Sequence, residues 1–134
     1  MKKLSTILAT ALFLLSSSLS AGEFADLHKM VVEARDSLVV LVKNEDKRGE
    51  AQQKLVKDTA NAVSAKIATM KAPAGKEAQF TEMSKNWADF KKTREDELVP
   101  LILAGKQAEG KKIAMGIQKE RLGKVVTLCL ELDK

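Results

Sequence analysis

The chain has 134 residues, of which 45% are hydrophobic and 31% are charged, and its formal net charge at pH 7 is +5. The single cysteine, Cys129, excludes an intrachain disulfide, and without a Cys-x-x-Cys-His motif covalent attachment of c-type haem is excluded. The length suffices for one domain with one hydrophobic core, which packing alone must hold together.

The first 22 residues have the three regions of a cleavable secretory signal peptide. Lys2 and Lys3 form the basic start, an apolar stretch runs from Leu4 to Leu15, and small residues follow up to Gly22. The apolar stretch is shorter than the roughly 20 residues that a membrane-spanning helix needs. We expect cleavage between Ser20 and Glu23, and a periplasmic or secreted domain, residues 23–134, without stable membrane insertion. An uncleaved segment would instead tether the domain to the membrane.

Two amphipathic helices follow the signal segment. The first has apolar residues at steps of three and four, and a polar stretch from Lys43 to Gly49 ends it. Its predicted inward stripe is Phe24, Leu27, Val31, Ala34, Leu38 and Leu41. The second helix is predicted over about residues 50–71 and stops before Pro73, because proline cannot extend a helix. Its predicted inward stripe is Val56, Ala60, Val63, Ile67 and Met70.

The third and fourth helices lie after Gly75. In the third, Pro100 is expected to kink the helix or restart it near Val99, and Gly105 is expected to end it. Its stripe is Phe80, Met83, Trp87 and Phe90, then the charged Arg94 and Glu97, then Leu98, Leu101 and Ile102. The fourth is predicted as one helix over residues 106–132, with Ala108, Met115, Leu122, Val126 and Cys129 inward. Short connections between four such helices predict an all-α, antiparallel up-down-up-down four-helix bundle.

Arg94 is the strongest candidate for a ligand contact, because a charge on an apolar face is costly to bury unless it is paired. One interpretation is that Arg94 and Glu97 pair on the surface, three residues apart, while Pro100 rotates the stripe. The other is that Arg94 faces a pocket between helices and binds a carboxylate-bearing ligand, with Trp87 and Phe90 as the walls. Trp87 also suits a plain core position.

Sulfur and imidazole groups are expected at one pole of the bundle, and they permit a second kind of site. The predicted topology collects His28, Met30, Met70, Met83 and Cys129 there, and such ligands suit copper or a haem iron. Methionines at helical spacing are commonly core residues, and a buried free cysteine behaves as a small hydrophobe. We therefore expect no metal and no cofactor, with His28, Met70 and Met83 as the alternative metal ligands.

Catalysis and nucleic-acid binding are not expected. A lone histidine and a lone cysteine near opposite ends of the chain do not make a nucleophile and its base, and no phosphate loop or His-Glu-x-x-His motif is present. The lysines between Lys106 and Lys124 alternate with Glu109 and Glu120, which indicates a solvated helix face.

The second half of the chain resembles a known family. The residues Asn-Trp-Ala-Asp-Phe-Lys-Lys-Thr-Arg over positions 86–94, Leu98 to Leu103, Gly105 to Glu109, and then Ala114 and Gly116 are similar to the second hairpin of the four-helix-bundle sensor domain of methyl-accepting chemotaxis receptors. That family tends to have an aromatic pair three residues apart, an arginine one turn later and a Gly-Lys or Gly-Asp turn. The first hairpin agrees in length and periodicity only.

The resemblance implies a periplasmic domain that binds small molecules, often carboxylates, between helices at a dimer interface. Chemotaxis receptors carry a membrane helix on each side of this domain, whereas this sequence ends at Lys134. We therefore expect a sensor-like module that binds a small ligand, or pairs with itself or with a membrane receptor. The alternatives are an interaction bundle without a ligand, and a b-type cytochrome-like bundle that binds haem or copper.

Overall fold

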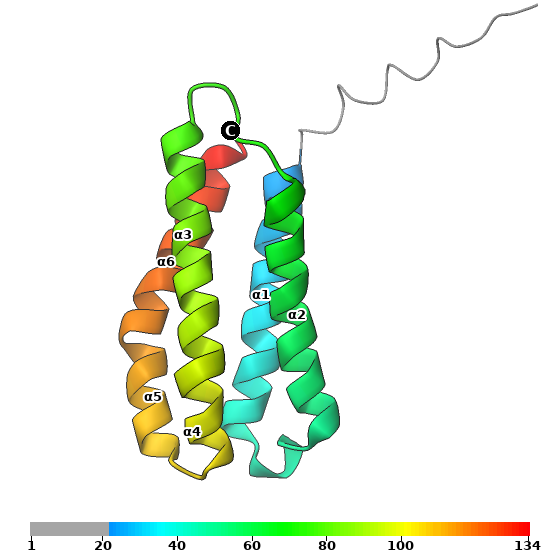
Figure 1. The fold of residues 1–134 in the computed structure, drawn as a ribbon, viewed down its shortest axis with the longest axis vertical. Helices are drawn as coiled ribbons and strands as arrows, with labels where there is room; N and C mark the ends of the chain where they lie inside the picture. Colours follow the sequence, from blue (N-terminus) through cyan, green and yellow to red (C-terminus); the bar gives the residue numbers. More distant parts are fainter. Residues whose placement is uncertain (1–21) are drawn as a thin grey trace, which may run out of the picture.

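The computed structural model describes residues 22–134, which form four helical limbs and no strand (Figure 1). The all-α four-helix bundle predicted from the sequence is confirmed, whereas residues 1–21 of the predicted signal peptide, which spans residues 1–22, lie outside the described residues. The first two limbs are α1 (Glu23–Lys43) and α2 (Glu50–Thr69), with a short 3-10 turn, η2 (Glu45–Lys47), between them. Within residues 22–134 no helix has both the length and the apolar character that crossing a membrane requires.

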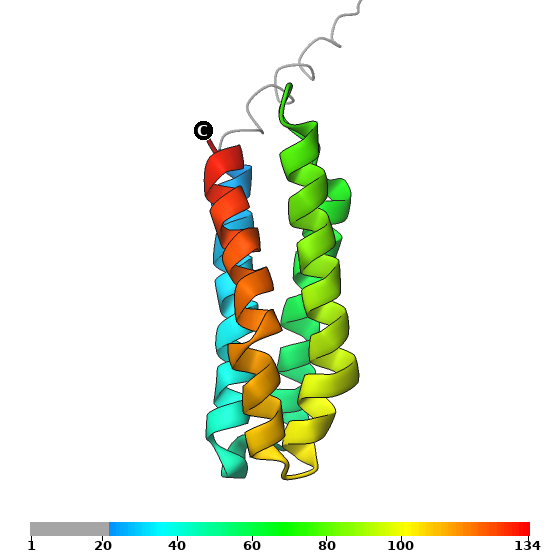
Figure 2. The ribbon, with the colours of Figure 1, turned by 90° about the vertical axis from the view of Figure 1, so that its left-hand side faces the viewer.

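The third and fourth limbs are each built from several pieces. The third consists of α3 (Glu77–Thr93), the π-helical turn η3 (Arg94–Leu98) and α4 (Val99–Leu103). The fourth consists of α5 (Gln107–Met115) and α6 (Ile117–Leu132). The limbs lie side by side along the long axis of the molecule (Figures 1 and 2). The contacts of α1 with α2 and of α3 with α6 are extensive, whereas α2 and α3 touch only sparsely.

Two clusters of buried side chains form the core, and they follow the predicted stripes closely. All six residues predicted to face inward from α1 are buried. The larger cluster surrounds Phe24, Met83 and Trp87, and the smaller one contains Leu38, Leu41, Val56, Leu98 and Ile102. Arg94 hydrogen-bonds one residue of each cluster, and it therefore lies between them.

Pro100 restarts the third limb close to the predicted position. The chain widens into a π-helical turn before it, in which the Val99 N–H donates to the Arg94 carbonyl, and α4 then begins at Val99. Proline is tolerated in a first helical turn because its missing N–H needs no partner there. The limb ends at Gly105, whose φ of 79° is left-handed, and the Lys106 N–H closes the end on the Leu101 carbonyl at 2.8 Å.

The prediction of one continuous fourth helix is wrong. The helix is interrupted at Gly116, where φ is −96° and ψ is −110°. The positions that face the core in α5 and in α6 therefore do not follow one continuous helical period. As a result Ala108 is exposed and the Met115 side chain is 64% exposed, although both were expected to face the core. Cys129 is buried as predicted, and Leu122 and Val126 pack at the edge of the core. The buried positions of this limb are Gly110, Gln118, Val125, Leu128, Cys129 and Leu132.

Candidate functional site

Arg94 lies at the centre of the bundle with no exposed surface. Its Nη1 donates to the Ala34 carbonyl of α1 at 2.8 Å, and its Nη2 donates to the Val56 carbonyl of α2 at 2.6 Å. Among the described residues its Nε has no partner. Burial lowers the pKa of Arg94 to about 10, against the opposing effect of the nearby Glu95 carboxylate, and the guanidinium remains charged at neutral pH. Arg94 therefore links three helical limbs through their backbones.

The surface pair of Arg94 with Glu97 is a wrong interpretation. Glu97 is exposed, and no ion pair between the two side chains exists in the described structure. The π-helical turn explains the difference, because the wider turn keeps both Arg94 and Leu98 buried while Glu97 points outward.

The two aromatic residues predicted to flank Arg94 stack on each other inside the core. The rings of Trp87 and Phe90 lie 5.4 Å apart between centroids, and their planes are inclined by 34°. The Trp87 Nε1 donates to Ser64 Oγ at 3.0 Å, which satisfies the indole N–H. Trp87 and Phe90 are 2% and 4% exposed, so both pack chiefly as core residues.

A groove with mainly apolar walls lies between α1 and the fourth limb, at the level of the break at Gly116. We call it the apolar groove, and its volume is about 310 Å³. Its base contains Phe90 and the buried Leu38 and Leu98. Its walls are apolar side chains from both limbs, namely Val39, Val42, Ala114, Met115 and Leu122.

Polar and basic side chains line both ends of the apolar groove. One end has Lys43, at the end of α1, together with Gln107 and Lys111 of α5, and the other has Arg35, Gln118 and Lys119. Within residues 22–134, no carboxylate lies within 4.0 Å of the ammonium groups of Lys43, Lys111 or Lys119, whereas Arg35 pairs with Asp36 at 2.7 Å.

Hydrogen bonds between α6 and α3 hold the groove-lining residues in place. The Gln118 Nε2 donates to the Phe90 carbonyl at 2.8 Å, and the Gln118 Oε1 accepts from Arg121 at 3.1 Å. The Arg121 Nη1 also donates to Thr93 Oγ1 at 2.8 Å. The wall beyond the break is therefore fixed to the last turn of α3.

A second, more polar groove of about 450 Å³ lies between α2 and α3 and is lined by Trp87, Ser64 and Ser84 among others. Its two lysines are each paired with an acid one turn away: Lys91 with Glu95 at 2.9 Å and Lys92 with Asp96 at 2.7 Å. Ligand sites are predominantly apolar with a few polar groups. The apolar groove fits that description better.

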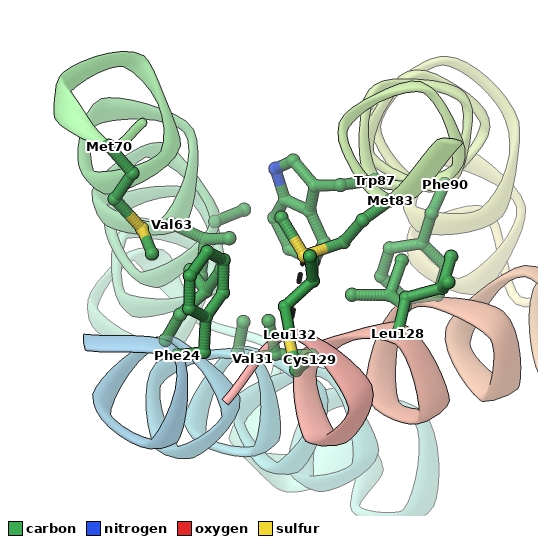
Figure 3. Close-up of a cluster of buried hydrophobic side chains, with 14 residues drawn as sticks. Phe24, Val31, Val63, Met70, Met83, Trp87, Phe90, Leu128, Cys129 and Leu132 are labelled. Carbon is green, nitrogen blue, oxygen red and sulfur yellow. Dashed lines mark hydrogen bonds between the residues drawn. The ribbon is translucent and has the colours of Figure 1, made fainter. Parts of the chain in front are cut away.

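Part of the predicted sulfur-rich pole is present in the core (Figure 3). The Cys129 Sγ lies 3.5 Å from the Met83 Sδ, and Met70 is buried in the same cluster, while His28 is half-buried. Burial raises the pKa of the Cys129 thiol to about 12, so the thiol stays protonated near neutral pH. The described residues contain no group of three or more His, Cys, Asp or Glu side chains that could hold a metal ion. These contacts describe core packing.

The structure distributes the predicted ligand contacts over different surroundings. Phe90 lines the apolar groove, Trp87 lines the polar one, and Arg94 lines neither. Sequence reasoning missed the apolar groove, although Val39 and Val42 are apolar residues outside the inward stripe of α1 and were a usable signal. The position of Met115 depends on the break at Gly116, which helical periodicity did not reveal.

Comparisons of the chain with models of protein families, with curated proteins and with solved structures found no match.

Proposed function

We propose that this chain is an exported, non-catalytic four-helix module that binds a small molecule in the apolar groove. The proposal includes cleavage of residues 1–22 and an antiparallel, up-down-up-down order of the limbs, which the short turns at 44–49, 70–76 and 104–106 favour. Phe90 is retained as a ligand contact. Trp87 packs against Phe90 in the core, and Arg94 becomes a structural residue that hydrogen-bonds the backbones of α1 and α2.

The observation that carries the proposal is the apolar groove itself. A volume of about 310 Å³ lies at the lower end of the range of about 300–1,000 Å³ that small-molecule sites occupy. Apolar side chains on both walls, with Met115 64% and Val39 37% exposed, leave apolar surface in contact with water that a ligand would cover. Gln107 supplies one of the few polar groups that orient a ligand in such a site, whereas the buried Gln118 is already hydrogen-bonded to Phe90 and Arg121.

The resemblance to receptor sensor domains supports a role in signalling for the module once a ligand is bound. A free module with an occupied groove would report to a membrane receptor or to a second copy of itself. The exposed apolar residues Met115 and Ile117 lie beside the break in the fourth limb. In this proposal a partner contacts them and thereby distinguishes the ligand-bound module from the free one.

Fluorescence of Trp87 tests the proposal without a label. Trp87 is the only tryptophan of the chain, and its ring contacts Phe90, which lines the apolar groove. A titration with small apolar and amphiphilic molecules is expected to change Trp87 emission saturably and to raise the melting temperature, because a ligand selective for the folded state stabilises it.

Two matched variants locate the response. Ala114→Phe fills the apolar groove and is expected to abolish the emission change, whereas Ala88→Phe places the same side chain in the polar groove and is expected to preserve it. Equal loss in both variants, or loss in Ala88→Phe alone, would refute the assignment to the apolar groove.

A further inference from the structure

The basic groups around the apolar groove are unequal at its two ends. At the end formed by Lys43 and Lys111, no described carboxylate lies within 4.0 Å of either ammonium group. At the other end, Arg35 donates hydrogen bonds of 3.0 and 2.7 Å to Asp36. Lys119 is then the remaining basic side chain at that end without a described carboxylate close to it. The stronger uncompensated positive charge is therefore at the end formed by Lys43 and Lys111.

The start of α5 adds to this charge. Gln107 is the first residue of α5, and the opening N–H groups of a helix carry a partial positive charge. The Arg48 Nη2 donates to Gln107 Oε1 at 2.8 Å, which brings a guanidinium next to the same end. Acids close in sequence are Glu45 and Asp46 of η2 and Glu109 of α5, all of them exposed, and Glu45 lies 4.0 Å from Arg48.

The rest of the groove suits a single aliphatic chain. Between the two basic ends its lining is apolar, with Leu38, Val39 and Met115 among the contacts. Arg35 and Lys43 are eight residues apart on α1, which corresponds to about 12 Å along the helix axis. A volume of about 310 Å³ over that length leaves room for one chain.

We infer that the ligand is a single-chain aliphatic carboxylate, with its acid group between Lys43 and Lys111 and its tail along Val39 and Met115 toward Leu122. The inference rests on the proposed function and specifies the ligand class for the same groove. Charge complementarity at one end and apolar walls along the length favour this class over a neutral apolar molecule. Because the groove has room for one tail, we take the ligand to be a free acid and not a lipid with two tails.

Isothermal titration calorimetry with octanoate and decanoate, each compared with the matching alcohol below the concentration of micelle formation, tests the inference. We expect the acids to bind about tenfold more tightly than the alcohols, since charge-assisted hydrogen bonds are about twice as strong as neutral ones. Each added methylene is expected to tighten binding about fourfold until the tail fills the groove.

A double variant tests the position of the acid group. Lys43→Gln with Lys111→Gln is expected to remove the preference for the acid while alcohol binding remains unchanged. Lys29→Gln with Lys57→Gln makes the same change of net charge at exposed sites outside the groove, and is expected to keep the preference. Loss of the preference in the control pair, or its retention in the groove pair, would overturn the placement of the acid group.

The outcomes separate this inference from the proposed function. If acids and alcohols bind equally and Ala114→Phe abolishes both, the groove is a ligand site and the inferred class is wrong. If neither binds, the inference fails, and the Trp87 titration with the wider set of small molecules then decides the proposed function separately. Binding to phosphatidylglycerol vesicles without binding to decanoate would show a lipid surface as the partner, and it also contradicts a single-chain ligand.

Discussion

Arg94 places a positive charge in the core, where no carboxylate of residues 22–134 lies within 4.0 Å of its guanidinium. Two backbone carbonyls, of Ala34 and Val56, take its Nη groups instead. Hydrogen bonds from a charged donor contribute about 1.5–3 kcal/mol each, and part of that gain is offset by the desolvation that lowers the pKa of Arg94 to about 10. The residue thus stabilises the relative position of three limbs.

Replacing Arg94 tests this structural role. Arg94→Ala is expected to lower the free energy of unfolding by about 3 kcal/mol or more, because it removes two charge-assisted hydrogen bonds and leaves a cavity. Arg94→Met keeps most of the volume without a buried charge and is expected to cost less. Urea unfolding followed by circular dichroism measures both changes.

Glu97→Ala provides the control. Glu97 is exposed, so the change is expected to stay within about 0.5 kcal/mol of the parent chain. Similar losses for Glu97→Ala and Arg94→Ala would mean that the two residues act as a pair, which the structure excludes.

Cys129 is expected to be unreactive in the folded chain. Its thiol is 1% exposed, and burial raises its pKa from 9.0 to about 12, with the Asp133 charge adding to the shift. Alkylation by iodoacetamide at pH 8 should therefore be far slower in the native chain than in urea, since the thiolate is the reactive form. Equal rates would show an accessible thiolate and would revive the metal-binding alternative.

The same shift predicts a direction for stability against pH. The unfolded chain ionises Cys129 near pH 9 while the folded chain keeps the proton, so the contribution of this thiol is complete below about pH 9 and is lost as pH rises toward 12. The stability difference between the parent chain and Cys129→Ala should accordingly shrink between pH 8 and pH 10.5 in urea unfolding. A constant difference would contradict a buried, protonated thiol.

Helix ends and breaks determine how the elements meet. The Arg48 side chain joins the end of α1 to the third limb: its Nε and Nη2 donate to the Leu41 and Val42 carbonyls at 2.8 Å, and its Nη1 donates to the Ile102 carbonyl at 3.3 Å. The Leu41 and Val42 carbonyls lie in the last turn of α1, where no intrahelical donor remains, whereas the Ile102 carbonyl also accepts from the Gly105 N–H at 3.1 Å.

Arg48→Ala is expected to destabilise the fold by about 2–3 kcal/mol, because several last-turn carbonyls lose a charged donor. Lys47→Ala changes an exposed neighbour of the same charge and should stay within about 0.5 kcal/mol. Both are measured by urea unfolding. If the two variants lose equal stability, the hydrogen bonds of Arg48 do not hold the end of α1.

Local signals in the sequence were sufficient for the elements that obey one helical period. The stripe from Phe24 to Leu41 and the stops at Pro73 and Gly105 are set by neighbours in sequence, and they were predictable. The phase of the fourth limb was not, because it depends on a backbone break at Gly116. The surroundings of Arg94 were missed for a similar reason, since the π-helical turn and the distant Ala34 and Val56 carbonyls decide them.

At the scale of the whole molecule, packing is uneven around the bundle. α1 packs closely on α2, and α3 on α6, while the apolar groove lies between α1 and the broken fourth limb. Stripe residues such as Leu38 and Phe90 form its base, but Val39 and Val42 in its walls lie beside the stripe of α1, so the stripe pattern alone does not predict it. A groove in a helical bundle can therefore arise from a break in helical phase and from apolar residues beside the stripes.

The proposed export is the other property that concerns the whole chain. Expression of the full sequence in a bacterial host is expected to give a periplasmic protein whose first residue lies between Ala21 and Glu23, as measured by intact mass and N-terminal sequencing. A full-length chain retained in the membrane fraction would show that Leu4 to Leu15 remains attached as part of an anchor.

The central claim is that a small molecule occupies the apolar groove, and methyl-resolved NMR during a decanoate titration tests it most directly. The account predicts saturable shifts of the methyl groups of Val39, Met115 and Leu122, with little change at Ala68 and Ala88 of the polar groove. Shifts confined to the polar groove, or no saturable shift at any methyl group, would contradict it.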